Sequence, residues 1–169
     1  YIYKNLGKNF DENGKLASEG KTDIKLAKEL LKHSFFKKKF PKSSDRSNFH
    51  SFFDNKSFKK LKIDDALATL SFITAKSISD SLKTLPIKPK NIIITGGGQY
   101  NRFLINTIDK LTKCNLFVAD DLNINGSFIE SELIAFLAVR SLQNLPITFP
   151  LTTGVKIPLS GGNISFPKT

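Results

Sequence analysis

The chain contains no methionine and no tryptophan in its 169 residues, and it has a single cysteine and two histidines. A lone cysteine, Cys114, excludes an internal disulfide, and no His and Cys cluster has zinc-site spacing, so we expect no metal site. Because Cys114 ends a predicted helix, we interpret it as a buried structural thiol rather than a nucleophile. The absence of an initiating methionine indicates a piece of a longer polypeptide.

Long apolar runs are also missing. No stretch reaches the length of a membrane span, and the first residues do not form a signal peptide. We therefore expect a soluble, cytoplasmic protein. The length fits one domain with its own core, which we divide into a basic, loop-rich segment (1–62), a core of helices and strands (63–145) and a Pro/Gly-rich tail (146–169).

Arginine is scarce, with three residues among 26 Lys and Arg, although the net charge is +11. Residues 1–62 hold 16 of the basic and 7 of the 15 acidic residues, which gives them a net charge of +9. Phenylalanines and lysines interleave over 35–60, which supports a nucleic-acid-binding module as one alternative. Such dense phenylalanines are more typical of a core, so we do not expect a nucleic-acid partner. His33 and His50 have no Ser or Cys partner in the sequence, and we expect both at the surface.

The N-terminal third is predicted to be irregular. Asn13-Gly14 predicts a hairpin or a loop, Thr22 is expected to cap a short helix, and residues 37–55 are expected to form a long loop.

A helical pattern runs from Asp64 to Pro86, and further elements come after it: a strand at 92–94, a helix at about 102–113, a strand at 116–118, and a helix after a capping box formed by Ser127 and Glu130. This succession favours an α/β layer with parallel strands. No element is expected past Pro146.

Three consecutive glycines, Gly96, Gly97 and Gly98, follow the first predicted strand. They expose backbone N–H groups ahead of a helix N-terminus, an arrangement that binds anions and most often nucleotides. Gly96 and Gly98 fill two positions of the dinucleotide fingerprint, but Asn101 occupies the third. Asp120 and Asp121 lie near the spacing of a ribose-binding acid. An NAD(P)-binding, Rossmann-like oxidoreductase domain therefore remains an alternative.

Six motifs occur in the order found in the anhydro-N-acetylmuramic acid kinase family, bacterial sugar kinases of the actin/hexokinase/Hsp70 ATPase superfamily, which the chain resembles over nearly its whole length. They comprise Asp11, Gly14, Ala17 and Gly20; Pro41, Lys42, Ser43, Ser44 and Arg46; Ala68, Thr69, Leu70, Thr74 and Ala75; Gly96, Gly97, Gly98 and Asn101; Glu130, Ala135, Leu137 and Ala138; and Thr153 and Gly154.

The resemblance implies the C-terminal half of such an enzyme, with an α/β fold: one lobe of a ribonuclease-H-like, actin-like ATPase, whose mixed sheet is flanked by helices. The implied reaction cleaves a 1,6-anhydro sugar ring with water and transfers the ATP γ-phosphate to the 6-oxygen, giving N-acetylmuramic acid 6-phosphate for cell-wall recycling. ATP and Mg²⁺ are the implied cofactors. An N-terminal lobe would carry the catalytic aspartate, so the chain alone is expected to be inactive. A homodimer is also implied.

The resemblance assigns roles only to matched positions. Gly96, Gly97, Gly98 and Asn101 match the adenosine-side loop of the nucleotide site.

Glu130 matches an acid facing the sugar, where it would hydrogen-bond the substrate or help polarise the attacking water. Its alternative is a structural role as the capping-box partner of Ser127. Lys42, Ser43 and Arg46 match a basic segment assigned weakly to substrate or lid contacts, with a solvated surface loop as the alternative.

Overall fold

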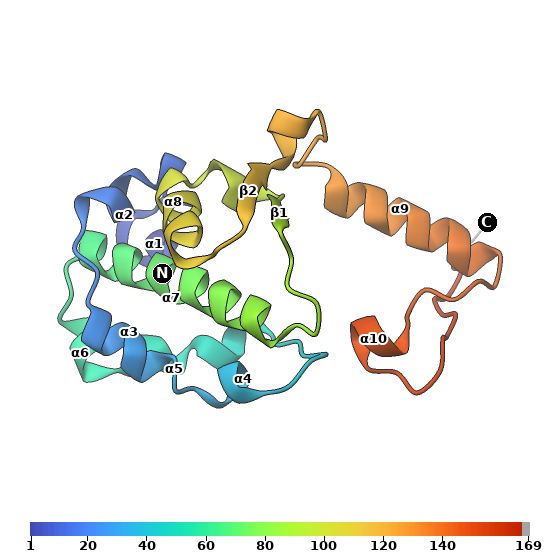
Figure 1. Ribbon diagram of the computed structural model, residues 1–169, viewed down its shortest axis with the longest axis horizontal. Helices are drawn as coiled ribbons and strands as arrows, with labels where there is room; N and C mark the ends of the chain where they lie inside the picture. The colour runs from blue at the N-terminus through green and yellow to red at the C-terminus, as the bar shows by residue number, and fades with distance from the viewer. Residues whose placement is uncertain (167–169) are drawn as a thin grey trace. The chain divides into compact units, whose positions relative to one another are not determined.

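The computed structural model describes residues 1–166 and contains two compact units (Figure 1). Unit 1 comprises residues 1–37 and 45–127, and unit 2 comprises residues 38–44 and those from 128 onward. The predicted tail, 146–169, belongs to unit 2, and its residues 167–169 lie outside the described part.

Short helices occupy the stretch predicted to be loop-rich, and none is longer than seven residues. They are α1 (Ile2–Leu6), α2 (Lys15–Glu19), α3 (Ile24–Leu30), α4 (Ser34–Lys37), α5 (Ser51–Asp54) and α6 (Lys56–Lys59), with 3-10 turns η1 (Glu12–Gly14) and η2 (Arg46–Phe49). The long loop predicted over 37–55 is therefore wrong in part, because η2 and α5 lie within it. Asp45 begins η2 by accepting a hydrogen bond from the Ser47 N–H.

The sequence predicts a hairpin or a loop at Asn13-Gly14. This prediction is wrong for the residues after the turn, which form helix α2. Both Asn13 and Gly14 have left-handed backbones, with φ of 54° and 70°, so the pair does form a tight turn. The chain then enters α2, because the Asp11 carboxylate accepts hydrogen bonds from the N–H groups of Leu16 and Ala17, each at 2.9 Å. Two helical N–H groups thus gain a side-chain partner, which favours a helix over a second strand.

The core of unit 1 forms where α3, α5 and α6 pack with α7 (Ile63–Thr84). Its buried side chains belong to Leu26, Ala27, Leu30, Phe52, Phe58, Ala66 and Ile73. Asp23, rather than the predicted Thr22, caps α3 by accepting from the Leu26 N–H. His33 is half-buried rather than exposed, because its ring lies 5.4 Å from that of Phe49. His50 is exposed, as predicted.

The predicted sequence of helix, strand, helix and strand from residue 63 to residue 118 is confirmed. Strand β1 (Asn91–Ile94) leads to α8 (Arg102–Leu111) and then to β2 (Asn115–Val118), and the strands pair in parallel with Ile93 opposite Phe117. Helices around a small parallel sheet are compatible with an α/β class. The mixed sheet that the resemblance implied is wrong for residues 1–166, where the sheet has two parallel strands. Ile93 and Phe117 are 49% and 38% exposed on one face of this two-stranded sheet.

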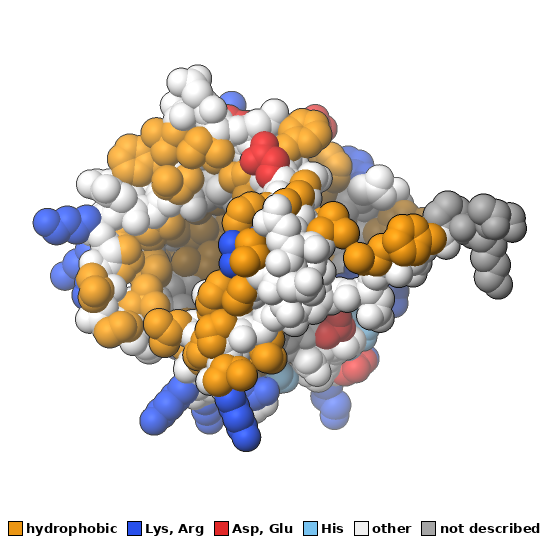
Figure 2. Space-filling view, turned by 90° about the vertical axis from the view of Figure 1, so that its right-hand side faces the viewer, with side chains coloured by type: hydrophobic (Ala, Val, Ile, Leu, Met, Phe, Trp, Pro, Cys, Tyr) orange, Lys and Arg blue, Asp and Glu red, His pale blue; other side chains and the backbone are white. Residues whose placement is uncertain are grey.

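Unit 2 contains α9 (Ile129–Leu142), α10 (Pro150–Thr153) and an antiparallel bridge between Thr148 and Leu159. No residue of α9 is buried, although most of its side chains are apolar. Figure 2 looks onto the side that carries α9 and shows apolar side chains gathered there. The exposed ones of α9 are Leu133, Ile134, Phe136, Val139 and Leu142. Helix α10 and the bridge were not predicted from the sequence, because four residues are too few to show a helical period.

Candidate functional site

Two loops meet at the carboxyl edge of the sheet in unit 1. The 3-10 turn η3 (Gly97–Tyr100) follows β1, and the turn η4 (Ala119–Leu122) follows β2. Because the strands are parallel, both loops leave the same edge. Ligands of α/β proteins bind at this kind of edge.

A hydrogen-bond network joins the two loops. The Gly96 N–H donates to the Gly126 carbonyl at 3.0 Å, and the Gly126 N–H donates to Asp120 Oδ1 at 3.0 Å. The Tyr100 hydroxyl donates to Asp120 Oδ2 at 2.9 Å, and Gln99 Nε2 donates to Asp120 Oδ1 at 3.3 Å. These donors, above all the Gly126 N–H and then Tyr100, lower the pKa of Asp120. Asp120 therefore ties the glycine loop to the loop after β2.

The network could not be read from the sequence, because its members lie up to 30 residues apart. The network also distinguishes Asp120 from Asp121, the two aspartates near the spacing expected of a ribose-binding acid. Asp120 is engaged within the protein, whereas Asp121 is exposed and has no hydrogen-bond or ionic partner among residues 1–166.

The glycine loop faces open space. A Cβ built on Gly96 or Gly97 meets no heavy atom within 4 Å, and one on Gly98 meets only Leu104 Cδ2, at 3.9 Å. Gly96 has φ 72° and ψ −172°, a backbone conformation that only glycine adopts readily. At Gly97, neither the backbone nor packing against the described residues requires a glycine.

Asn101 lies at the start of α8 as its N-cap. Its Oδ1 accepts a hydrogen bond from the Leu104 N–H at 2.9 Å, so the predicted binding residue has a structural role of its own. The same Oδ1 explains Gly14, because a Cβ there would lie 2.1 Å from it. Two motifs far apart in the sequence, around Gly14 and around Asn101, are thus in contact.

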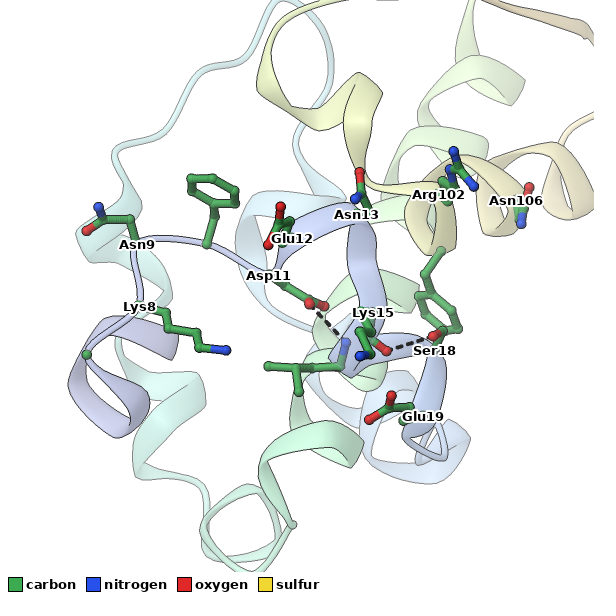
Figure 3. A pocket seen from close by; sticks show the side chains of 14 residues that line it. Lys8, Asn9, Asp11, Glu12, Asn13, Lys15, Ser18, Glu19, Arg102 and Asn106 are labelled. Carbon is green, nitrogen blue, oxygen red and sulfur yellow. Dashed lines mark hydrogen bonds between the residues drawn. The ribbon is translucent and has the colours of Figure 1, made fainter.

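A polar hollow of about 920 Å³ lies beside this contact, between the segment from Gly7 to Glu19 and the first turns of α8 (Figure 3). Arg102 and Asn106 line it from α8, and Lys8 and Lys15 from the other side. Within the described chain, neither lysine nor Arg102 has an ion-pair partner. Sequence reasoning missed this hollow, because its lining comes from segments about 90 residues apart.

Glu130 lies in unit 2, in the first turn of α9, and its side chain is exposed. The predicted capping box is wrong: Phe128 occupies the N-cap position and no side chain caps the helix. The Ser127 hydroxyl instead lies 2.9 Å from the Tyr100 hydroxyl. With the structural alternative removed, the Glu130 carboxylate has no partner among residues 1–166.

The weakly assigned basic residues fall in both units. Lys42 and Ser43 belong to unit 2, where Lys42 Nζ lies 5.3 Å from the centre of the Phe40 ring. Arg46 belongs to unit 1, where it is exposed at the start of η2. A role of these residues in substrate or lid contacts stays a prediction.

Metal-binding clusters and membrane-spanning helices are both absent from the described chain. Within residues 1–166, no group of three or more His, Cys, Asp or Glu side chains has the arrangement of a metal site. Over the same residues, no helix combines the length and apolar character needed to cross a membrane.

Comparison with known proteins gives a consistent result. Residues 1–167 match the family model described as anhydro-N-acetylmuramic acid kinase. Proteins of that name from Zymomonas mobilis and Rhodopseudomonas palustris are 36% and 37% identical to this chain over 98% and 99% of its length. A third, from Methylorubrum populi, is 35% identical over 99%. The chain covers 44%, 45% and 43% of these relatives respectively, which is less than half of each.

Proposed function

The chain belongs to the anhydro-N-acetylmuramic acid kinase family, and from that premise we propose that it forms the C-terminal lobe of an ATP-dependent sugar kinase with an actin-like ATPase fold. The complete enzyme would cleave the 1,6-anhydro ring of anhydro-N-acetylmuramic acid with water and phosphorylate the 6-oxygen. The proposal places this reaction in the bacterial cytoplasm, as the resemblance implies.

The observation that carries the proposal is the open space over the glycine loop. Gly97 lacks a side chain although no described atom lies within 4 Å of where its Cβ would stand. A glycine without a backbone or packing reason is explained when a ligand lies against the main chain. Gly96 to Gly98 would thus support the adenosine side of ATP, and the network through Asp120 would hold the loop in place.

Mg²⁺ would reach this site with the ATP phosphates and neutralise their charge during transfer. Residues 1–166 contain no carboxylate cluster that would hold the metal. We therefore assign the Mg²⁺ ligands to the phosphates and to the rest of the parent enzyme.

Glu130 is proposed to contact the anhydro sugar. A carboxylate without an internal partner can accept a hydrogen bond from a substrate hydroxyl or from the attacking water. The catalytic base is proposed to lie outside this chain, so that the chain alone does not transfer phosphate. ATP-dependent phosphorylation of the anhydro sugar by this chain alone would contradict that assignment.

The exposed apolar surfaces support the proposed partner, the remaining lobe of the enzyme. Parallel sheets are normally covered on both faces, yet Ile93 and Phe117 are exposed. A helix that is apolar on all sides is normally buried, yet α9 buries nothing. The resemblance also implies a homodimer, in which a second copy of the chain would cover these surfaces instead.

The test compares nucleotides. We expect MgATP to bind the chain more tightly than NAD, and Gly97→Ala to weaken ATP binding about tenfold by obstructing its approach while leaving the melting temperature unchanged. The matched control is Gly161→Ala, since an added Cβ there makes an ordinary contact at 3.5 Å with Ile147. Preferential NAD binding that is lost in Asp121→Ala would favour the oxidoreductase alternative instead.

Titrations of the same kind, with DNA or RNA in place of the nucleotides, test the nucleic-acid-binding alternative. It would require binding of DNA or RNA that weakens steeply with salt and depends on the lysines between Lys37 and Lys42. We expect no such binding.

A further inference from the structure

A second cavity in unit 1 lies at the opposite end of the sheet from the glycine loop. It measures about 540 Å³, within the usual range for small-molecule sites. Pro89 and Cys114, which precede β1 and β2, line one side, and the last turns of α7 and α8 line the other. Because β1 and β2 are parallel, their amino ends place this cavity away from the proposed nucleotide site.

The walls are mainly apolar and hold one unsatisfied polar atom. Leu82 and Leu111 line the cavity with Pro89. The Ser79 hydroxyl donates to the Leu111 carbonyl at 2.6 Å, and Cys114 Sγ donates to the Pro89 carbonyl at 3.1 Å. Thr112 Oγ1 is buried and has no partner among the described residues. Because this oxygen has almost no accessible surface, it lies behind the cavity wall and does not reach a ligand.

Three lysines surround this cavity, and one of them is unpaired. Lys83 Nζ lies 3.1 Å from Asp80 Oδ1, and Lys88 Nζ donates to the carbonyls of Lys83 and Leu85. Lys113 has no hydrogen-bond or ionic partner within residues 1–166. Lys113 lines the cavity, so its ammonium group is the free donor at this wall among the described residues.

We propose that this cavity binds a small amphipathic carboxylate, with its apolar chain between Leu82 and Leu111 and its carboxylate on Lys113. An apolar interior with a few polar groups at one place is the usual construction of a small-molecule site. A lysine ammonium donates hydrogen bonds and carries positive charge, so it selects an acceptor head group of negative charge. This site is separate from the nucleotide loop and does not depend on the kinase proposal.

The probe is octanoate, and Cys114 reports where it binds. Cys114 is the single cysteine of the chain, and it is half-buried and lines the cavity rather than being buried as predicted. Bound octanoate should therefore slow its alkylation by iodoacetamide in proportion to occupancy. We expect Lys113→Ala to raise the octanoate concentration for half-protection about tenfold. Thr112→Val should leave that concentration unchanged, because the Thr112 hydroxyl does not face the cavity. Octanol, which has the same length without the charge, should protect more weakly.

Lys110→Ala is the matched control, since Lys110 is an exposed lysine of α8 outside the cavity. Absence of protection by octanoate, equal protection by octanol, or an equal effect of Lys110→Ala and Lys113→Ala would each overturn the proposal. If Cys114 in the free chain alkylates too slowly to measure, calorimetric titration of octanoate into the chain and the two lysine variants makes the same comparison.

Discussion

Helices α7 and α9 differ in a way that sequence patterns do not reveal. Both were predicted from apolar periodicity, and both form. Helix α7 buries Ala66, Ile73 and Ala75 against its neighbours, whereas α9 buries no residue within the described chain. Periodicity therefore predicts a helix, while burial depends on a partner that only the tertiary structure supplies.

The largest expected effect comes from making the same substitution in the two regions. Leu26, which packs against α7 in the core, is 2% exposed, and Leu133 on α9 is 52% exposed. We expect Leu26→Ala to lower the free energy of unfolding by about 2–5 kcal/mol and Leu133→Ala to change it by less than about 0.5 kcal/mol. Urea denaturation followed by circular dichroism measures both.

The comparison sharpens once the proposed partner lobe is present. If that lobe covers α9, Leu133→Ala should then weaken the association of the two parts, measured by titrating one with the other. If Leu133→Ala lowers the free energy of unfolding of the chain alone as much as Leu26→Ala does, then α9 is already packed in solution.

The elements from α7 to β2 were predictable because their signals are local. Pro86 ends the helical pattern, the isoleucines of β1 precede three glycines, and apolar periodicity marks the helix that follows them. Each of these features acts within a few residues of its position, so the sequence order is enough to place it.

The failures come from side chains that found distant or unexpected partners. Asn13-Gly14 formed its turn, but Asp11 directed the next residues into a helix. Ser127 and Glu130 have capping-box spacing, but the Ser127 hydroxyl lies beside Tyr100, 27 residues away. The glycines of the candidate site were found from the sequence, whereas the Asp120 network that holds them required the fold.

The starts of α8 and α9 provide a comparison of intermediate size: Asn101 caps α8, which was not predicted, whereas the capping box predicted for α9 does not form. Asn101 accepts a hydrogen bond from the Leu104 N–H, while Ser127 makes no capping bond to α9. We expect Asn101→Ala to destabilise the chain by about 1 kcal/mol. Glu130→Gln should leave stability unchanged, because no capping box exists to be broken.

Thermal denaturation of the two variants at one pH checks this difference. A loss of stability in Glu130→Gln similar to that of Asn101→Ala would restore the structural role of Glu130 and remove the support for its contact with substrate.

The smallest expected effect concerns the two neighbouring aspartates, and it depends on pH. Hydrogen bonds from Gly126, Tyr100 and Gln99 hold the pKa of Asp120 below its ordinary value of about 3.9. A carboxyl whose pKa is lower in the folded state stabilises the fold above its unfolded pKa, and this contribution is lost as the pH falls through the lowered value. Asp120→Asn should therefore be less stable than the native chain at pH 7, and the difference should shrink towards pH 3.

The control is Asp121→Asn, because Asp121 is exposed and has no partner in the described chain. Its stability should track that of the native chain at every pH. Melting temperatures measured from pH 7 down to pH 3 test both variants. A constant difference between Asp120→Asn and the native chain over this range would mean that the carboxylate charge does not hold the two loops together.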